Sequence, residues 1–281
     1  MKVLSLFDGM SCGQIAIGRA GIPVEKYYAA EIDKHAIKVT QHNYPDTIQL
    51  GDVQDIDGQE YDIDLLLGGS PCQGFSFAGK QFNFEDPRSK LFFEYVRILE
   101  ESDPAYFLLE NVKMKQEYQN IISDMLGVQP IKINSSLVSA QSRERLYWSN
   151  IPGIEQPTDK NICLSDIIEQ ECIGGAKRAR YINGVSGKTY QKIELRTDDK
   201  ANAMTTVKKN SMVSVNNVLR NLHIDEAEQL QTVPINYSSC VSNTQRYKML
   251  GNGWTVDVIA HILKPLARHK IANKLMHRTS L

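Results

Sequence analysis

The first 150 residues alternate short apolar runs with helix-like segments, and this alternation constrains the fold more than any other feature. Strand-like runs cover residues 2–7, 27–32, 64–67 and 105–109, and helix-like segments cover residues 14–20, 34–43 and 89–101. Strands separated by helices of this length form βαβ units, so we predict an α/β fold with a mainly parallel, doubly wound sheet. Ligands bind such a sheet at the carboxyl ends of its strands. The residues that follow each strand are therefore the candidate site.

The sequence after Trp148 has a different texture. Residues 151–219 show no sustained periodicity and carry basic clusters at 177–180 and 208–209. Helical patterning returns at about 225–231 and from 255 to about 273. We predict a small loop-rich lobe at 151–219, inserted between an α/β domain at 1–150 and a return to that domain at 220–281 that ends in a helix.

Charge is divided unevenly along the chain. Residues 1–110 contain 9 Lys and Arg against 18 Asp and Glu, a balance of −9, whereas residues 111–281 contain 23 against 15, a balance of +8. A basic second half suits a phosphate backbone, although compositional drift explains the asymmetry equally well. No apolar run approaches the roughly 18 to 20 residues that span a bilayer, so we expect a cytoplasmic protein with no membrane or export segment.

The cysteines give no metal signature. There are five, none in a C-x-x-C pattern: Cys12, Cys72, Cys163, Cys172 and Cys240. An odd, scattered set fits a reducing compartment, and we expect no bound metal.

Acidic and glycine-containing turns follow the first strands. Phe7-Asp8-Gly9 begins a turn between a strand and a helix, where backbone N–H groups can meet a ligand. Glu31 ends the next strand and suits ribose hydroxyls, and Asp52 could accept from an exocyclic amine. Together these positions indicate an adenosine-containing cofactor, whereas each alone is more often an ordinary turn or a solvated acid.

A cysteine on a turn is the sharpest candidate. Cys72 lies in the Gly/Pro-rich segment 68–76 after a strand, placed as a nucleophile would be, although a buried thiol is equally compatible with the spacing. Glu110 leaves the apolar strand 106–109 and is partly desolvated, which favours a proton on its carboxyl at neutral pH. Arg143 and Arg145 share one face if their segment is extended; a solvated charged loop is the alternative.

These residues, in this order, resemble the DNA cytosine-5 methyltransferases. The resemblance spans nearly the whole chain, and its motifs are Phe7-Asp8-Gly9, Gly51-Asp52-Val53, Pro71-Cys72-Gln73, Glu110-Asn111-Val112, Gln141 to Arg145, Arg220 to His223 with Glu226, and Gly251-Asn252-Gly253-Trp254. Phe7-Asp8-Gly9 and the Trp254 segment are closer to the animal de novo branch, whereas Gln73 and residues 141–145 follow the bacterial pattern. The chain resembles a compact unit intermediate between the two, without a preceding reader domain.

The resemblance implies a Rossmann-like, S-adenosylmethionine-dependent enzyme. A Cys72 thiolate would add to carbon 6 of a flipped cytosine, so that carbon 5 can take the methyl group, with Glu110 at ring nitrogen 3 and the exocyclic amine. Arg143, with Arg145 beside it, would favour the thiolate. The implied cofactor-binding residues are Phe7, Asp8, Gly9, Glu31, Ile32, Asp52, Val53, Pro71, Leu91, Asn252 and Trp254.

The resemblance also implies double-stranded DNA as the partner. Residues 1–150 would be the catalytic and cofactor-binding domain, and residues 151–219 the target-recognition lobe for a short sequence. The segment from Gln73 to Arg88 could close over the flipped base or be an ordered surface loop. The implied DNA-binding residues are Gln73, Ser76, Arg88, Thr205 and Thr206.

Two alternatives use the same resemblance. One is an RNA cytosine-5 methyltransferase, but the chain has no Cys-Phe-Thr segment typical of that branch and does have a dedicated lobe. The other is a catalytically inert DNA-binding homologue, which the intact Cys72, Glu110 and arginines disfavour. The sequence leaves open the recognition sequence, the choice between monomer and homodimer, and whether a companion nuclease makes it part of a restriction-modification pair.

Overall fold

The computed structural model describes residues 1–70, 87–181 and 188–278, without the side chains of 87–89 and 268–278. The chain divides into two compact units. The first contains residues 1–133, 144–156 and 257–281, and the second contains 134–143 and 157–256. Contacts thus group residues 220–256 with the second unit, whereas we expected 220–281 to return to the first domain. The functional division into domains stays a prediction.

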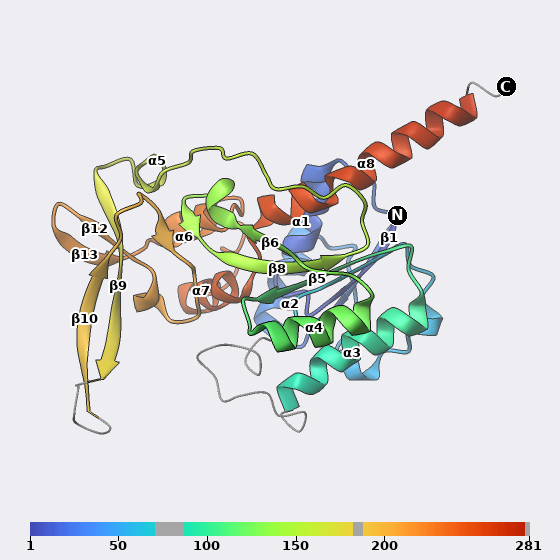
Figure 1. Ribbon diagram of the computed structural model, residues 1–281, viewed down its shortest axis with the longest axis horizontal. Helices are drawn as coiled ribbons and strands as arrows, with labels where there is room; N and C mark the ends of the chain where they lie inside the picture. Colours follow the sequence, from blue (N-terminus) through green and yellow to red (C-terminus); the bar gives the residue numbers. More distant parts are fainter. Residues whose placement is uncertain (71–86, 182–187, 279–281) are drawn as a thin grey trace. The chain divides into compact units, whose positions relative to one another are not determined.

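The first unit is built on a seven-stranded sheet (Figure 1). Its order is β3-β2-β1-β4-β5-β8-β6, and β1 to β5 pair in parallel while β8 is antiparallel to β5. The bounds are β1 Lys2–Leu6, β2 Lys26–Ala30, β3 Ile48–Gln49, β4 Leu65–Gly68, β5 Tyr106–Val112, β6 Ile131–Asn134 and β8 Glu144–Ser149. The strand order reverses between β1 and β4, so a ligand is expected near the carboxyl ends of these two strands. This confirms the predicted doubly wound α/β fold.

Helices cover the sheet on both faces (Figure 1). They are α1 Cys12–Ala20, α2 Lys34–Asn43, α3 Pro87–Ser102, α4 Gln116–Leu126 and α8 Val256–Arg278. The α1 helix ends at Gly21, whose φ of 73° is the left-handed conformation that glycine adopts readily. The α2 helix begins at Asp33, whose carboxylate accepts from the His35 N–H at 2.9 Å and caps the helix.

The core of the first unit lies between the sheet and helices α3 and α4. Leu4, Leu66 and Leu109 from three neighbouring strands pack in one cluster with Phe92 of α3 and Ile122 of α4. All of these side chains except Ile122 come from segments that the sequence predicted, and burial of apolar area explains why the segments fold together. Among the described residues, no helix is long and apolar enough to cross a membrane.

The second unit is smaller and partly antiparallel. Its four-stranded sheet has the order β10-β9-β12-β13, with β9 Cys172–Tyr181, β10 Thr189–Leu195, β12 Met212–Val215 and β13 Val218–Asn221. Asn216 and Asn217, with φ of 50° and 63°, form the two-residue turn between β12 and β13. The helices are α5 Leu164–Ile168, α6 Ile224–Leu230 and α7 Asn243–Asn252, and β7 Gln141–Ser142 pairs with β11 Ala201–Asn202.

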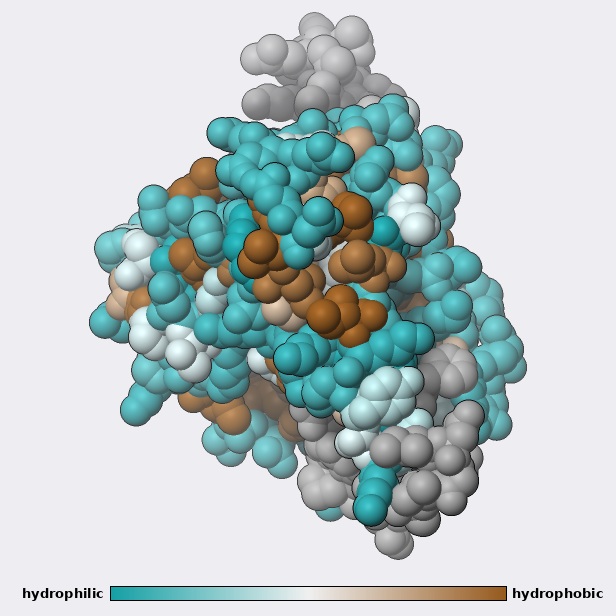
Figure 2. All heavy atoms as spheres, turned by 90° about the vertical axis from the view of Figure 1, so that its left-hand side faces the viewer, coloured by the Kyte–Doolittle hydropathy of each residue, from teal (hydrophilic) through white to brown (hydrophobic). Residues whose placement is uncertain are grey.

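One face of the second unit's sheet carries exposed apolar side chains. Ile173, Ile193 and Leu195 are 43%, 55% and 53% exposed, and the cross-strand register puts them on the same face. Figure 2 looks onto the side that bears these strands and shows apolar side chains gathered among hydrophilic ones. The clustered arginines of β9 instead meet Glu194, because Arg180 binds its carboxylate with two contacts of 2.6 Å and Arg178 lies at 3.5 Å.

Candidate active site

A tight turn follows β1 at the edge where a ligand is expected. Phe7, Gly9 and Ser11 have φ of 57°, 60° and 59°, so three of five consecutive residues adopt the left-handed conformation. That conformation costs free energy for a residue with a side chain and persists only where surrounding contacts fix it. Phe7 is half-buried against the core cluster, which is one such contact. The turn directs the Gly9 N–H toward β2.

Glu31 receives that N–H and closes the turn against β2. Its Oε2 accepts from the Gly9 N–H at 2.8 Å, and its Oε1 accepts from the N–H groups of Ile32 and Asp33, each at 2.8 Å. Three backbone donors therefore orient one carboxylate at the end of β2. Since a carboxylate has about four acceptor positions, one remains toward solvent. This suits a hydroxyl donor such as a ribose.

The other predicted cofactor residues of this edge differ in exposure. Ile32 is 72% exposed directly after Glu31 and so presents an apolar surface beside that carboxylate. Asp52 is half-buried and its Oδ1 accepts from the Gln54 N–H at 3.0 Å. Val53 is 4% exposed and belongs to the core, against which the half-buried Leu91 packs.

Asp8, by contrast, faces inward. It is 9% exposed, and its Oδ1 accepts from the Tyr27 hydroxyl at 2.7 Å while its Oδ2 accepts from the Ser11 hydroxyl. Burial raises the pKa of the Asp8 carboxyl to about 6, although hydrogen bonds to hydroxyls act in the opposite direction. The Asp8 carboxylate thus points into the protein, and the cofactor-binding role of Asp8 stays a prediction.

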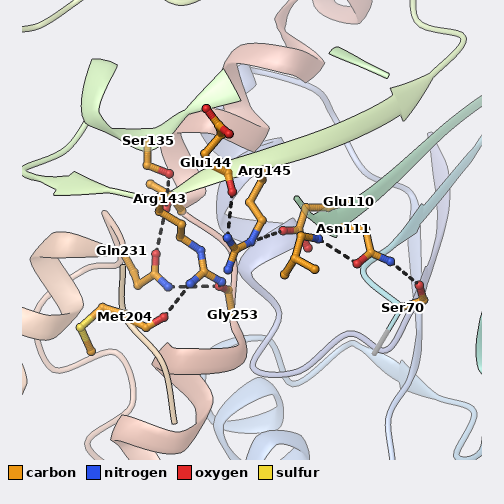
Figure 3. Close-up of polar contacts among 12 residues, drawn as sticks. Ser70, Glu110, Asn111, Ser135, Arg143, Glu144, Arg145, Met204, Gln231 and Gly253 are labelled. Atoms are coloured by element: carbon orange, nitrogen blue, oxygen red, sulfur yellow. Dashed lines mark hydrogen bonds and ion pairs between the residues drawn. The ribbon is translucent and has the colours of Figure 1, made fainter. Parts of the chain in front are cut away.

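A second group of polar residues lies where β4 and β5 end side by side. The register pairs Gly68 with Leu109, and two residues later the Asn111 Nδ2 donates to the Ser70 hydroxyl at 3.1 Å. Between them on β5, Glu110 is 8% exposed and pairs with Arg145 of β8, with Oε1 and Nε 3.0 Å apart (Figure 3). In the β5–β8 pairing, Glu110 lies opposite Tyr147. Arg145 is two residues from Tyr147 on β8, so its side chain is on the same face of the sheet as Glu110. The carboxylate is thus held by a neighbouring strand.

Several predicted residues lie outside the described part of the chain: Pro71, Cys72, Gln73 and Ser76. Arg88 lies in the first turn of α3, and its side chain is not described. Ser70 is the last described residue before Cys72, and the Asn111 side chain holds its hydroxyl beside the end of β5.

Arg143 binds main-chain carbonyl groups of the second unit. It is 4% exposed, its Nη1 donates to the Met204 carbonyl at 2.7 Å and its Nη2 donates to the Gly253 carbonyl at 3.0 Å (Figure 3). The sequence predicted that Arg143 and Arg145 act as a pair of charges beside Cys72. Their described partners differ, since Arg145 meets a carboxylate and Arg143 meets two carbonyls. The Arg143 geometry is that of a guanidinium satisfying buried acceptors.

Two buried glutamines complete this network, and sequence reasoning assigned a role to neither. Gln141 and Gln231 are both fully buried, and the Gln141 Nε2 donates to the Gln231 Oε1 at 2.8 Å. Gln231 Nε2 in turn donates to the carbonyls of Leu250 and Gly253 at 2.6 and 3.1 Å. Gln141 lies in the motif at residues 141–145, and this motif is the sequence signal for its role. Gln231 follows an ordinary amphipathic helix and carries no local signal.

The predicted recognition residues also belong to the second unit. Thr205 Oγ1 accepts from the Val207 N–H at 3.2 Å and from Asn210 Nδ2 at 3.2 Å, which fixes a turn, and Thr206 is exposed beside it. Asn252 is exposed at the end of α7, and Trp254 is half-buried before α8. The DNA-contacting role of the threonines and the cofactor-contacting role of Asn252 and Trp254 stay predictions.

The chain matches the model of a known protein family. The family described as C-5 cytosine-specific DNA methylase matches residues 1–151 and 139–268. Type II methyltransferase M1.ScrFI of Lactococcus lactis subsp. cremoris is 31% identical over 313 residues, covering 98% of this chain and 78% of that protein.

Other relatives match over shorter segments. Orphan methyltransferase M.SPRI of Bacillus phage SPR is 38% identical over 175 residues, which are 57% of this chain and 39% of that protein. Orphan methyltransferase M.Rho11sI of Bacillus phage rho11s gives the same identity over 34% of its length. The matched segment therefore spans little more than a third of these two curated relatives.

Solved structures share the fold. A mutant of Spodoptera frugiperda DNMT2 superposes with a TM-score of 0.68 at 23% identity, covering 94% of this chain and 99% of that one. A prophage-encoded E. coli protein superposes with a TM-score of 0.71 at 19% identity, covering 95% and 99%. At these identities the likeness supports the fold alone.

Proposed function

The chain belongs to the family of C-5 cytosine-specific DNA methylases, and from this membership we propose that it methylates carbon 5 of cytosine in double-stranded DNA. The methyl donor in this proposal is S-adenosylmethionine. The observation that carries it is the buried Glu110 carboxylate, held by Arg145 beside the strand that leads into the Cys72 segment. The proposal includes a cytoplasmic location, because both the DNA and the methyl donor are intracellular.

The carboxyl edge of β1 and β2 fits the adenosine part of the donor. Glu31 keeps an acceptor position for a ribose hydroxyl after binding three backbone N–H groups. Ile32 offers an exposed apolar surface for a flat base, and Asp52 offers acceptor oxygens for an exocyclic amine. When bound, S-adenosylmethionine would supply an electrophilic methyl group.

Covalent activation by Cys72 would solve the reactivity problem of the base. Carbon 5 of cytosine is a poor nucleophile, but addition of a thiolate to carbon 6 turns the ring into an enamine. After methylation, loss of the carbon 5 proton to a base and elimination of the Cys72 thiolate restore the aromatic ring. Cys72 ends the cycle as it began, and the product is 5-methylcytosine.

Glu110, acting as a carboxylic acid, would donate its hydrogen to ring nitrogen 3 and so stabilise the negative charge that develops on the ring while sulfur adds. A carboxyl group at ring nitrogen 3 and the exocyclic amine binds the Watson–Crick edge, which is accessible only in a flipped base. Arg145 holds that group in place, with Nε 3.0 Å from Oε1, so little reorganisation is needed when the base arrives. Such fixed dipoles and charges are the largest source of rate enhancement in many enzymes.

The second unit would supply target recognition. Its described basic side chains include Lys209, which is exposed, whereas Arg178 and Arg180 are paired with Glu194. Arg143 donates to the Met204 carbonyl, and Gln141 Oε1 accepts from the Met204 N–H, so these two side chains fix the segment that precedes Thr205 and Thr206. We infer that these threonines lie at the DNA interface.

Base-resolution sequencing tests the activity. Plasmid DNA is incubated with labelled S-adenosylmethionine and the wild type, Cys72→Ala or Cys163→Ala, in competition with RNA of matched length. We expect methylcytosine in a short DNA context for the wild type and for Cys163→Ala, because Cys163 is the residue at the N-cap of α5 in the second unit. Label in RNA alone, on adenine, or at equal level in Cys72→Ala would contradict the proposal.

Trapping the adduct tests the covalent step separately. Duplex DNA with 5-fluorocytosine at the target position cannot lose a carbon 5 proton, so the sulfur–carbon bond persists after methyl transfer. We expect a denaturation-resistant complex with the wild type and none with Cys72→Ala. Methylation of ordinary DNA without a trapped complex would exclude the covalent route while leaving the activity.

A further inference from the structure

A buried carboxylate lies directly beneath the turn that forms the candidate cofactor edge. Asp8 is 9% exposed and accepts from the hydroxyls of Tyr27 and Ser11 on its two oxygens. Its own N–H donates to the Ala30 carbonyl at 3.1 Å, and its carbonyl accepts from the Ser11 N–H at 3.2 Å. The residue therefore joins β1, β2 and the start of α1 through both its backbone and its side chain.

The hydrogen-bond directions around Asp8 require it to accept. Ser11 Oγ receives the Gln14 amide at 3.3 Å and the Thr40 hydroxyl at 3.1 Å, which leaves its own hydrogen to point at Asp8. Tyr27 donates from the other side. An ionised carboxylate accepts both hydrogens on charged oxygens, whereas a protonated carboxyl has less acceptor capacity and so weakens the bond to the oxygen that carries its hydrogen.

The same network holds the left-handed turn that meets Glu31. Ser11 has a φ of 59° and begins α1 without a side-chain cap, so its conformation depends on its bonds to Asp8 and Thr40. The Gly9 N–H between them is the group that orients Glu31 at 2.8 Å. A change at Asp8 would thus reach the ribose-facing carboxylate without any direct contact between Asp8 and ligand.

We propose that Asp8 is a proton-linked positioning residue for the methyl donor: its ionised carboxylate holds the turn that orients Glu31, and protonation weakens donor binding. This inference rests on the proposed function, because it assumes that the adenosine part of the donor binds at Glu31. It assigns Asp8 an inward-facing role, with no carboxylate contact to the donor.

The surrounding groups define the pH range. Tyr27 of β2 and Glu31, directly after β2, face Asp8. The other neighbouring side chains are uncharged: Ser5 of β1, Gln14 of α1 and Thr40 of α2. Burial raises the pKa of Asp8 to about 6, and the negative charge of Glu31 acts in the same direction. If the donor binds the form with ionised Asp8, its affinity would therefore be independent of pH above about pH 7 and would fall as the pH drops below 6.

Calorimetric binding of S-adenosylhomocysteine between pH 5.0 and pH 8.0 tests the inference without relying on catalysis. We expect wild-type affinity to fall on the order of tenfold from pH 7.5 to pH 5.0. The reason is that pH 5.0 lies about one unit below the pKa of Asp8, where only roughly a tenth of the molecules carry the ionised carboxylate. Asp8→Asn should bind weakly with a flat profile. Tyr27→Phe should move the midpoint to higher pH, because the ionised form loses a hydrogen bond.

Controls separate this role from others. His35→Gln removes an imidazole from the first turn of α2, and it should keep the wild-type profile. Ser11→Ala gives a second route to the same loss of affinity if Asp8→Asn folds poorly by circular dichroism. A flat wild-type profile, or an unmoved midpoint in Tyr27→Phe, would overturn the inference. Absence of binding at every pH would instead count against the proposed function.

Discussion

The ion pair of Glu110 with Arg145 determines what a single substitution does at the candidate active site. Both side chains are largely buried, at 11% and 16% exposure, so neither is screened as a surface pair would be. Removing one partner leaves the other charge poorly solvated and displaced from its position. The pair therefore positions a functional group, and its contribution to global stability is secondary.

Glu110→Gln should lower the rate of methyl transfer by about 10² to 10⁴-fold, the range for loss of a positioned acid–base group. Affinity for S-adenosylhomocysteine should stay within about twofold, because Glu110 lies on β5, away from Glu31. Single-turnover methylation and calorimetry measure the two quantities. The matched control is Glu117→Gln, an exposed acid of α4. Equal rates for the two variants would refute the assigned role.

Asp8 also predicts how stability depends on pH. Its pKa is about 6 in the folded protein against an ordinary value of 3.8, so folding favours the protonated form. The protonated Asp8 therefore contributes about 3 kcal/mol to the free energy of unfolding below pH 3.8, and this contribution is lost as the pH rises through 6. Relative to Asp8→Asn, the wild type should therefore lose about 2 kcal/mol between pH 4.5 and pH 7.5. Urea unfolding at both pH values measures this difference; a constant difference would contradict it.

At the scale of elements, close backbone contacts limit which residue a position can accept. A Cβ added at Gly251 of α7 would lie 2.3 Å from the Thr205 carbonyl carbon and 2.4 Å from the Thr206 N. Only glycine allows α7 to approach the 205–206 segment this closely, because backbone atoms cannot move aside as a flexible side chain can. The motif glycine is thus explained by packing against the predicted recognition segment.

Gly251→Ala should destabilise the second unit by roughly 2 to 4 kcal/mol, a large value for one methyl group, because overpacking here displaces backbone. Gly18→Ala is the matched control, since its added Cβ meets nothing within 4 Å in α1. That control should gain up to about 1 kcal/mol from helix propensity. Chemical denaturation monitored by fluorescence distinguishes them; destabilisation of equal size in both would show that the contact carries no weight.

Sequence patterns predicted the elements of the first unit and less of the second. The α2 helix matches its predicted bounds, and β1, β4 and α3 differ by one or two residues, because apolar periodicity and turn residues fix such elements locally. The long strands β9 and β10 were not predicted, since exposed strands carry little alternation. The network of Gln141, Gln231 and Arg143 joins residues up to 110 positions apart, and no local pattern encodes such contacts.

At the scale of the whole molecule, the two compact units carry net charges of opposite sign. The first unit contains 18 Lys and Arg against 23 Asp and Glu, a balance of −5, and the second contains 14 against 10, a balance of +4. The asymmetry along the sequence is therefore also an asymmetry between folded units. Part of the second unit's positive charge is neutralised locally by Glu194, and Lys208 lies over the Tyr247 ring at 4.0 Å.

Lys209 is thus the basic residue of the 208–209 cluster best placed for phosphate, being exposed beside the Thr205 turn. Loss of one phosphate contact reduces the magnitude of the slope of log affinity against log salt concentration by about 1. It also weakens binding to all DNA sequences by a similar factor. Lys209→Gln should show this change in fluorescence-anisotropy titrations from about 50 to 200 mM salt. Lys26→Gln is the control, because Lys26 is exposed at the amino end of β2, opposite the candidate site. A reduced slope for Lys26→Gln and an unchanged one for Lys209→Gln would assign DNA binding to the first unit, against the charge distribution.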